Sequence, residues 1–369
     1  MSEATEVFTM LIRVGKALLI AVVGGTICSL VHSPLPWLLG PLIMSVVCKF
    51  FGMKEVSVPA WFRKVGLIVV GVTLGMRITP EIWQTMANHL GLMLIGTIIT
   101  ILFGVLNAWI VYRFEKVDVV TAIFSNIPGG LTEMVTIGQT MGGNLQIISM
   151  FHSIRVVIIV CFTPYFVRLL TASSSGVSTG IQGGAVVGVL TTLGLLSIGA
   201  IGALLVSKAR VPAPFLLGSL LFAAAACLAF SIGQGGATLA KPVVNFAQAA
   251  IGLSIGLEFR RDDLVKHRRF FFLGMAHSLL LFVLSLTLAF VLPYVSDIEL
   301  IASVLGTAPG GIAEMSLTAL MTGADPLLVT AFQLFRVLFI VTVFSFLIRA
   351  FVKRIEAKSP GTIEKTYPA

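Results

Sequence analysis

The chain has 369 residues, of which 57% are hydrophobic and only 11% are charged, and its mean hydropathy is +1.03. A soluble domain carries about 25% charged residues, so this composition excludes an ordinary soluble fold and indicates a polytopic membrane protein. The net charge of +9 comes from Lys and Arg scattered through short loops between apolar segments. That distribution is typical of membrane orientation, and we expect no nucleic-acid partner.

Apolar segments follow one another along the chain, and most are long enough to cross a bilayer of about 30 Å as a helix. We predict spanning helices over 11–32, 35–51, 60–77, 88–112 and 144–168, and then over 185–207, 213–231, 242–259, 270–293 and 325–348. The first segment runs past the length of a cleavable signal and lacks a small-residue cleavage site. The expected fold class is therefore an all-α polytopic membrane protein embedded in a lipid bilayer.

Three motifs recur in the same order in the two halves of the chain. They are "PWLLG" at 36–40 with "PFLLG" at 214–218, "GVTLGM" from Gly71 with "GLSIGL" from Gly252, and "NIPGGLTEM" at 126–134 with "TAPGGIAEM" at 307–315. The recurrence predicts an internal duplication. We expect one membrane repeat over 1–170 and a second over 185–369, joined by a Ser/Gly-rich linker at 171–184.

The Pro-Gly-Gly motif interrupts an apolar segment in each half, at 117–142 and at 298–323. Each apolar run before the motif has about 12 residues, or about 18 Å of helix, which is too short to cross the membrane alone. If each segment enters and leaves on one side, five helices cross per half and most Lys and Arg are cytoplasmic. If each segment crosses once, the basic loop at 260–269 lies outside, so the positive-inside rule favours the first arrangement.

An odd number of crossings per half inverts the second repeat relative to the first and places both termini in the cytoplasm. Inverted repeats with an interrupted, re-entrant or broken helix at matching positions are typical of secondary transporters. The backbone at each Pro-Gly-Gly needs hydrogen bonds that lipid cannot supply, so we expect it to be packed in protein or to line a watery cavity. We also expect the two segments to meet near the middle of the membrane and to form one shared site.

Each interruption combines residues suited to binding ions. The N–H groups that begin the next helix carry partial positive charge and predict an anion site. The glutamate in that first turn is a candidate for binding a coupling cation, and the arginine in the following helix is a candidate charge partner or substrate anchor. The candidate substrate- or ion-binding residues are Asn126, Pro128, Gly129, Gly130, Thr132, Glu133, His152 and Arg155, with Thr307, Pro309, Gly310, Gly311, Glu314, Gln333 and Arg336.

The same residues also have purely structural interpretations. A Pro-Gly-Gly sequence often only kinks or turns the chain. Arg155 and Arg336 would then neutralise Glu133 and Glu314, and His152 would be a hydrogen-bonded packing residue.

The duplicated domain and its Pro-Gly-Gly-x-x-Glu-Met signature resemble the AbrB-type membrane proteins of bacteria over about residues 10–350. The resemblance implies location in the bacterial inner membrane, and the family is similar to cation/proton antiporters and anion transporters. Its members carry labels such as ammonia monooxygenase or regulator. The signature falls on Pro128, Gly129, Gly130, Glu133 and Met134, and on Pro309, Gly310, Gly311, Glu314 and Met315. Thr132 differs from its counterpart Ala313, which indicates that the two halves are not equivalent at the site.

We expect no catalytic residues, no metal site and no cofactor. An oxygenase holds iron or copper with clustered His, carboxylate or Cys ligands, whereas the five histidines here are scattered and the four cysteines lie within apolar segments. The predicted function is therefore a secondary transporter for a small, anionic metabolite, coupled to H⁺ or Na⁺. A channel with re-entrant filter loops and a membrane-embedded regulatory protein are the alternatives, and a homodimer is left open.

Overall fold

The computed structural model describes residues 3–53, 56–78, 87–115, 117–172, 186–209, 211–230, 232, 237–259, 268–344 and 346–348. This part of the chain is built from helices, with one isolated bridge between Val186 and Thr238. The all-α membrane fold predicted from the composition is confirmed. Most of the expected linker at 171–184 lies outside the described residues.

Fifteen helices are defined in the described residues, and they fall into two sets. The first half contains α1 (Glu3–Leu30), α2 (Pro36–Phe50), α3 (Ala60–Gly75), α5 (Leu90–Glu115), α6 (Val119–Asn126), α7 (Leu131–Thr140) and α8 (Leu145–Ala172). The second half contains α9 (Val189–Ser207), α10 (Pro214–Phe230), α11 (Lys241–Leu257), α13 (Arg268–Val295), α14 (Leu300–Thr307), α15 (Ile312–Thr322), α16 (Pro326–Phe339) and the π-helix η1 (Ile340–Phe344).

Six helical stretches within the described ranges are long and apolar enough to cross a membrane, so the chain is a multi-pass membrane protein. The other four expected spans are α2, α3, α10 and α11, whose 15 to 17 residues correspond to about 22–26 Å of helix. The six include Ile12–Leu30 and Pro326–Ile348, close to the spans predicted over 11–32 and 325–348. The helix α1 that contains the first span begins earlier, at Glu3, and the last span contains the π-helix η1 from Ile340.

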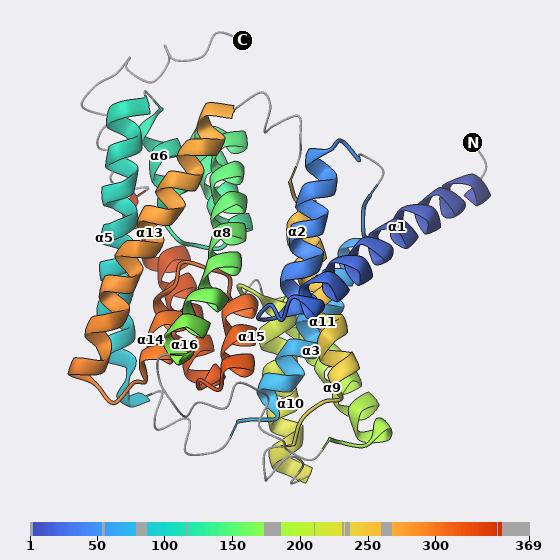
Figure 1. Ribbon diagram of the computed structural model, residues 1–369. Coiled ribbons are helices and arrows are strands. Elements are labelled where there is room, and N and C mark those ends of the chain that lie inside the picture. The colour runs from blue at the N-terminus through green and yellow to red at the C-terminus, as the bar shows by residue number, and fades with distance from the viewer. Residues whose placement is uncertain are drawn as a thin grey trace.

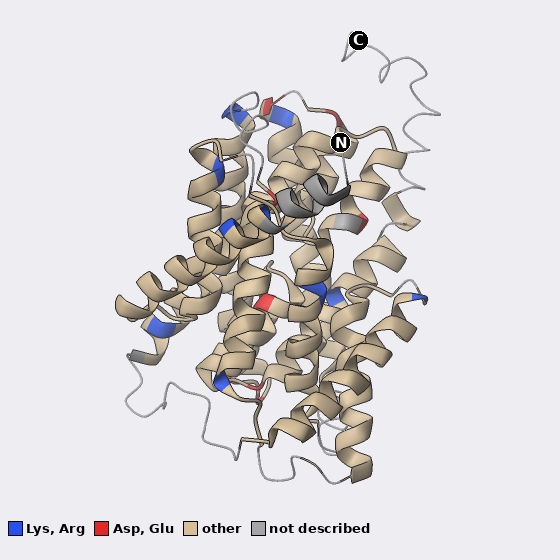
Figure 2. Cartoon of the chain, turned by 90° about the vertical axis from the view of Figure 1, so that its right-hand side faces the viewer, with Lys and Arg blue, Asp and Glu red and all other residues tan. Residues whose placement is uncertain are grey.

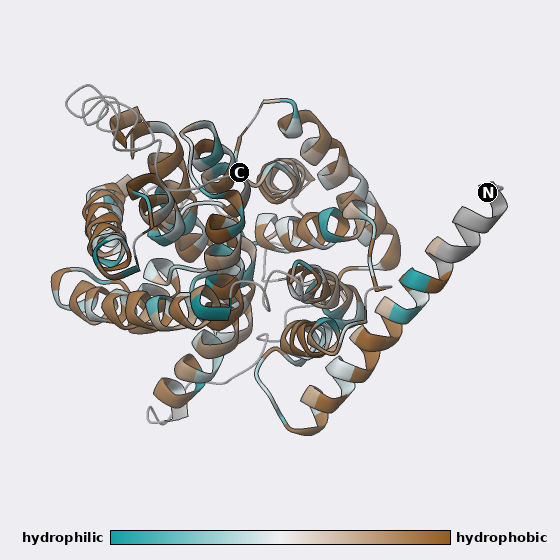
Figure 3. Ribbon diagram, turned by 90° about the horizontal axis from the view of Figure 1, so that it is seen from above, coloured by the Kyte–Doolittle hydropathy of each residue, from teal (hydrophilic) through white to brown (hydrophobic). Residues whose placement is uncertain are grey.

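The helices form two bundles, and each bundle takes helices from both halves of the sequence (Figure 1). We call α5–α8 with α13–α16 the hairpin bundle, and α1–α3 with α9–α11 the crossed bundle. Seen from above, the two bundles lie side by side, and hydrophobic residues cover most of each (Figure 3). The repeats in the sequence are therefore interleaved in space rather than folded as two separate units.

Equivalent helices of the two halves run in opposite directions. Glu115, the last residue of α5, forms an ion pair with Arg269 at the start of α13, with 2.7 Å between Oε2 and Nη2. Gly96 near the start of α5 faces Leu288 near the end of α13. Since α5 and α13 occupy the same place in their repeats, this antiparallel pairing shows that the second repeat is inverted.

The recurring glycine motifs join the halves within the crossed bundle. A Cβ atom on Gly252 of α11 would overlap the carbonyl oxygen of Leu38 on α2. In the other half, a Cβ on Gly71 of α3 would overlap the carbonyl oxygen of Leu216 on α10. The motif that begins at Gly252 thus packs on "PWLLG", and the motif that begins at Gly71 packs on "PFLLG". Each motif needs glycine because the two helix backbones approach closely.

Replacing Gly252 with Ala is expected to destabilise the protein by about 1–3 kcal/mol or more, because a backbone oxygen cannot move aside as a side chain can. The matched control is Gly194→Ala in α9, where a Cβ meets no atom within 4 Å and the substitution removes the helix penalty of glycine. Thermal unfolding of the purified variants, followed by the loss of the monodisperse peak, measures the difference. Equal melting temperatures for the two variants would contradict the close approach.

Candidate functional site

Each Pro-Gly-Gly segment forms a helical hairpin that turns back at the motif. We call α6 and α7 hairpin 1, and α14 and α15 hairpin 2. Phe124 near the end of α6 lies beside His152 on α8, with 2.7 Å between its oxygen and Nε2. At the base of the hairpin, the amide of Asn144, just before α8, donates to Thr121 Oγ1 at 2.7 Å. Since the start of α8 lies beside the start of α6, the chain returns to the side from which it entered.

Arg336 holds the tip of hairpin 2 through backbone carbonyls. Its Nη1 donates to the oxygens of Thr307 at 3.2 Å and Ala308 at 2.9 Å, and its Nη2 donates to Gly310 at 3.3 Å. Gln333 accepts from the same guanidinium and donates in turn to Ala308. These carbonyls are left without intrahelical partners where α14 ends, and they carry the negative end of its dipole. The buried charge of Arg336 is therefore matched by helix-end carbonyls.

Arg155 holds the tip of hairpin 1 in the same way, but its neighbour is a histidine rather than a glutamine. Its Nη1 donates to Ile127 at 3.3 Å, and its Nη2 contacts His152 Nδ1 at 2.7 Å. Because His152 Nε2 must donate to the oxygen of Phe124, its Nδ1 accepts from the arginine, which is the arrangement of a neutral imidazole. His152 and its counterpart Gln333 thus play the same part, each joining an arginine to a helix end.

The two glutamates fold back over the start of their own helices. Glu133 is the third residue of α7 and Glu314 the third residue of α15. A Cβ added at Gly130 would overlap the Glu133 carboxylate, and one added at Gly311 would overlap the Glu314 carboxylate. Each carboxylate therefore lies at the positive end of a helix dipole, where a negative charge is stabilised.

The arginines and glutamates do not pair with one another. Among the described residues, no ion pair joins Glu133 or Glu314 to Arg155 or Arg336. The sequence-based suggestion that the arginines act as charge partners of the glutamates differs from the observed geometry. Each carboxylate therefore interacts with the positive end of its own helix dipole rather than with an arginine.

The geometry explains the residue types of the signature. A Cβ on Gly129 would lie 2.7 Å from Met134 Sδ, and a Cβ on Gly310 would lie 3.0 Å from Met315 Cε. The first glycine of each motif therefore makes room for the methionine, and the second makes room for the glutamate. Both methionines are fully buried and anchor the hairpin tips in the core.

The remaining predicted site residues either bond to their own helix or are buried. Asn126 donates to Ala122, and Thr307 donates to Ser303, so each polar side chain bonds its own helix one turn earlier. Pro128 and Pro309 are buried. The side chain of Thr132 lies outside the described part of the structure.

Both hairpin tips lie against α8. A Cβ on Gly310 would lie 3.0 Å from Ile159 on α8, one turn beyond Arg155. Arg155 and Arg336 are close enough to interact electrostatically. The helix α15 also packs against α3 of the crossed bundle, where Arg63 pairs with Glu258 at 2.6 Å. Figure 2 shows the few charged residues that lie at mid-height between the more numerous ones at the ends. The predicted residues of both halves therefore lie around α8, where the arginines hold the two hairpin tips.

Comparison with known proteins assigns the family. The family model described as transition state regulatory protein AbrB matches residues 37–352. The chain belongs to the AbrB family. It is 29% identical over 350 residues to "Uncharacterized protein YhjN" of Bacillus subtilis (strain 168), covering 87% of this chain and 88% of the relative. It is 24% identical over 312 residues to "Putative regulator AbrB" of Escherichia coli (strain K12), covering 83% and 87%.

This AbrB-family chain contains a polar pair that the sequence analysis missed. Asn107 on α5 donates its amide to the carbonyl of His277 on α13 at 2.9 Å, and its Oδ1 lies 2.7 Å from His277 Nδ1. Both residues are buried. The sequence could have pointed to them, because each is a polar residue within an apolar helix. A polar residue within a membrane span is a functional candidate by default.

Within the described ranges of this family member, no three His, Cys, Asp or Glu side chains are grouped in a way that would hold a metal ion. Cys28, Cys48, Cys161 and Cys227 are free thiols. The chemistry available at the site is therefore that of helix dipoles, two arginines and two carboxylates.

Proposed function

We propose that this protein is a secondary transporter that moves a small, anionic metabolite across the bacterial inner membrane by alternating access, coupled to H⁺ or Na⁺. The observation that carries the proposal is the pair of hairpins whose tips both lie against α8, at Arg155 and at Ile159. Interrupted helices at a repeat interface, with their N-termini directed at the substrate, are the usual binding architecture of such transporters.

The positive charge at the tips favours an anionic substrate. The helices α7 and α15 begin at Gly130 and Gly311, which are half-buried rather than sealed in the core. Arg155 and Arg336 place two buried guanidinium groups against the hairpin tips. Two helix N-termini and two guanidinium groups provide the positive charge that would hold a carboxylate.

The glutamates are our candidates for binding the coupling ion. Glu314 is 3% exposed, whereas Glu133 is half-buried, so the two carboxylates occupy different surroundings. Since α15 packs against α3 of the crossed bundle, movement of the two bundles against each other would change the access of Glu314 to water. Binding of a cation at the glutamates would then be linked to the position of the bundles.

The printed name of the E. coli relative favours the regulatory alternative, in which the membrane helices change state without carrying a substrate. A channel is the other alternative, because re-entrant hairpins also build selectivity filters.

Uptake by membrane vesicles from wild-type and deletion strains tests the proposal. A panel of radiolabelled mono-, di- and tricarboxylates is offered with and without an imposed H⁺ or Na⁺ gradient. A transporter predicts accumulation of at least one compound in wild-type vesicles only, and only with the gradient. A channel equilibrates its compound without accumulation. Identical behaviour of the two strains across the panel would sink the transport proposal.

The charge distribution predicts which loops face the cytoplasm. Cysteines placed at Ser174 and at Lys266, which both lie outside the described residues, are exposed to an impermeant thiol reagent in intact cells. The inverted ten-crossing topology predicts strong labelling at Ser174 and none at Lys266. The native cysteines are replaced by Ala so that the signal is unambiguous, and the reverse labelling pattern would refute the topology.

A further inference from the structure

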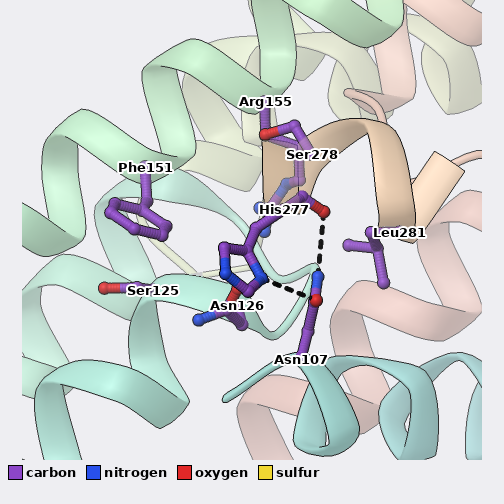
Figure 4. A pocket seen from close by; sticks show the side chains of 8 residues that line it. All are labelled: Asn107, Ser125, Asn126, Phe151, Arg155, His277, Ser278 and Leu281. Atoms are coloured by element: carbon purple, nitrogen blue, oxygen red, sulfur yellow. Dashed lines mark hydrogen bonds between the residues drawn. The ribbon is translucent and has the colours of Figure 1, made fainter. Parts of the chain in front are cut away.

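A small cavity lies inside the hairpin bundle, between α5, α6, α8 and α13 (Figure 4). It is lined by Asn107, Ser125, Asn126, Phe151, Arg155, His277, Ser278 and Leu281. The cavity has room for about one water molecule, and six of its eight lining residues have polar side chains. It lies behind the tip of hairpin 1, on the side formed by α13.

Two polar atoms at this cavity have no partner in the protein. They are Ser125 Oγ and Arg155 Nε, and both are buried. The ring of His277 lies between Asn107 and Ser125 (Figure 4). Since the Asn107 amide nitrogen donates to the His277 carbonyl, its Oδ1 accepts from His277 Nδ1–H. The neutral imidazole therefore keeps a lone pair on Nε2.

The other half of the molecule does not repeat this cavity. Shifted by the 181 residues that relate the two motifs, Asn107 becomes Leu288, Ser125 becomes Gly306, and His277 corresponds to Gly96. Leu288 faces Gly96 in the structure, just as Asn107 faces His277. The fold thus does not require polar residues here, because the equivalent position is filled by a leucine.

We propose that the cavity binds a single water molecule that links His277 to Arg155 and Ser125, and that His277 is a proton-binding residue coupled to the tip of hairpin 1. The water accepts from Arg155 Nε–H and donates to the lone pair of His277 Nε2, which satisfies both groups. Buried waters occur where unpaired donors and acceptors converge in this way.

Protonation of His277 changes this arrangement. A proton from solvent adds to Nε2, so that the nitrogen becomes a donor and the water must reorient. Glu115 on α5 acts on the ring electrostatically, and Arg155 on α8 lines the same cavity as the ring. Repulsion between the imidazolium and Arg155 weakens the bond from Arg155 to Ile127 at the hairpin tip. Acidification is therefore expected to loosen hairpin 1 and to leave hairpin 2 unchanged.

Hydrogen–deuterium exchange of the full chain in lipid nanodiscs tests this inference, with hairpin 2 as an internal control. After correction for the intrinsic pH dependence of exchange, protection of residues 119–140 should fall about tenfold as the pH is lowered from about pH 7.5 to the lowest pH at which the wild type stays folded, because His277 then takes up a proton. Protection of 300–322 should change less than twofold. His277→Gln keeps a neutral hydrogen-bonding side chain and should remove the fall. Ser125→Gly, which introduces the residue of the other half, should reduce it.

Histidine-selective nitrogen NMR of the same samples identifies the proton. The signal lost in His277→Gln should show an Nδ1–H tautomer at neutral pH and should titrate on acidification. Equal responses of the two hairpins, a response that survives His277→Gln, or an imidazole that does not titrate would each overturn the proposal. The inference goes beyond the transport proposal, since no substrate is used and the result stands whether or not uptake is found.

Discussion

Replacing both Glu133 and Glu314 with Gln is expected to reduce gradient-driven uptake at least tenfold while the protein still folds and inserts. The amide has nearly the same size as the carboxylate and fits against Gly130 and Gly311 in the same way. It carries no charge and binds neither H⁺ nor Na⁺ at this position. A tenfold loss corresponds to about 1.4 kcal/mol, which is modest for removing a charged ligand of an ion.

Proteoliposomes that contain the double variant and a carboxylate taken up by the wild type provide the measurement. Counterflow of labelled against unlabelled substrate without an ion gradient serves as the control, since exchange need not use the coupling ion. Loss of both activities would assign the glutamates to the substrate. Uptake at the wild-type rate would show that the two acids are structural, and the coupling role would have to be abandoned.

Arg336→Met is expected to be the most destabilising single substitution at the site. The variant leaves the carbonyls of Thr307, Ala308 and Gly310 without their donor in a buried place. Each unsatisfied buried group costs about 1–3 kcal/mol. Arg155→Met removes one such carbonyl contact, to Ile127, and the partner of His152. The expected order of stability is therefore wild type, then Arg155→Met, then Arg336→Met.

Thermal unfolding in one detergent and lipid mixture measures this order. Arg63→Gln is the matched control, because the side chains of Arg63 and of its partner Glu258 are 39% and 33% exposed, and exposed ion pairs contribute only about 0–1 kcal/mol. An Arg336→Met protein as stable as the Arg63→Gln protein would show that the guanidinium does not hold the hairpin tip.

The sequence was sufficient to predict the class of fold and the position of the interruptions. Hydrophobic runs report directly on burial in a bilayer, because each residue of a span pays its own transfer free energy. Pro128 and the two glycines after it stop a helix by local sterics alone. The odd number of crossings followed from the charges of the loops. Each of these inferences depends on residues close together in the chain.

Helix ends were less predictable. Apolar residues continue through Ile340 without interruption, so hydropathy gives no sign of the change to a π-helix there. The start of α1 at Glu3 was also hidden, because a helix that projects beyond the apolar run is stabilised by its own backbone hydrogen bonds rather than by lipid.

The partners of the charged residues depended on the tertiary structure. Arg155 lies near Glu133 in the sequence, which suggested an ion pair, yet it binds the carbonyl of Ile127. Once α6 lies parallel to α8, helix-end carbonyls come within reach of the guanidinium. A carbonyl has no signature in a sequence because every residue carries one.

The contact between Asn107 and His277 also could not be predicted from the sequence. The two residues are 170 positions apart and belong to different repeats. Only the antiparallel packing of α5 on α13 brings them together and encloses the cavity beside Arg155. The sequence by itself thus determined which segments enter the membrane and where they turn. The packing of the inverted halves decided which polar groups meet there, because a contact between distant residues is set by the whole arrangement of helices.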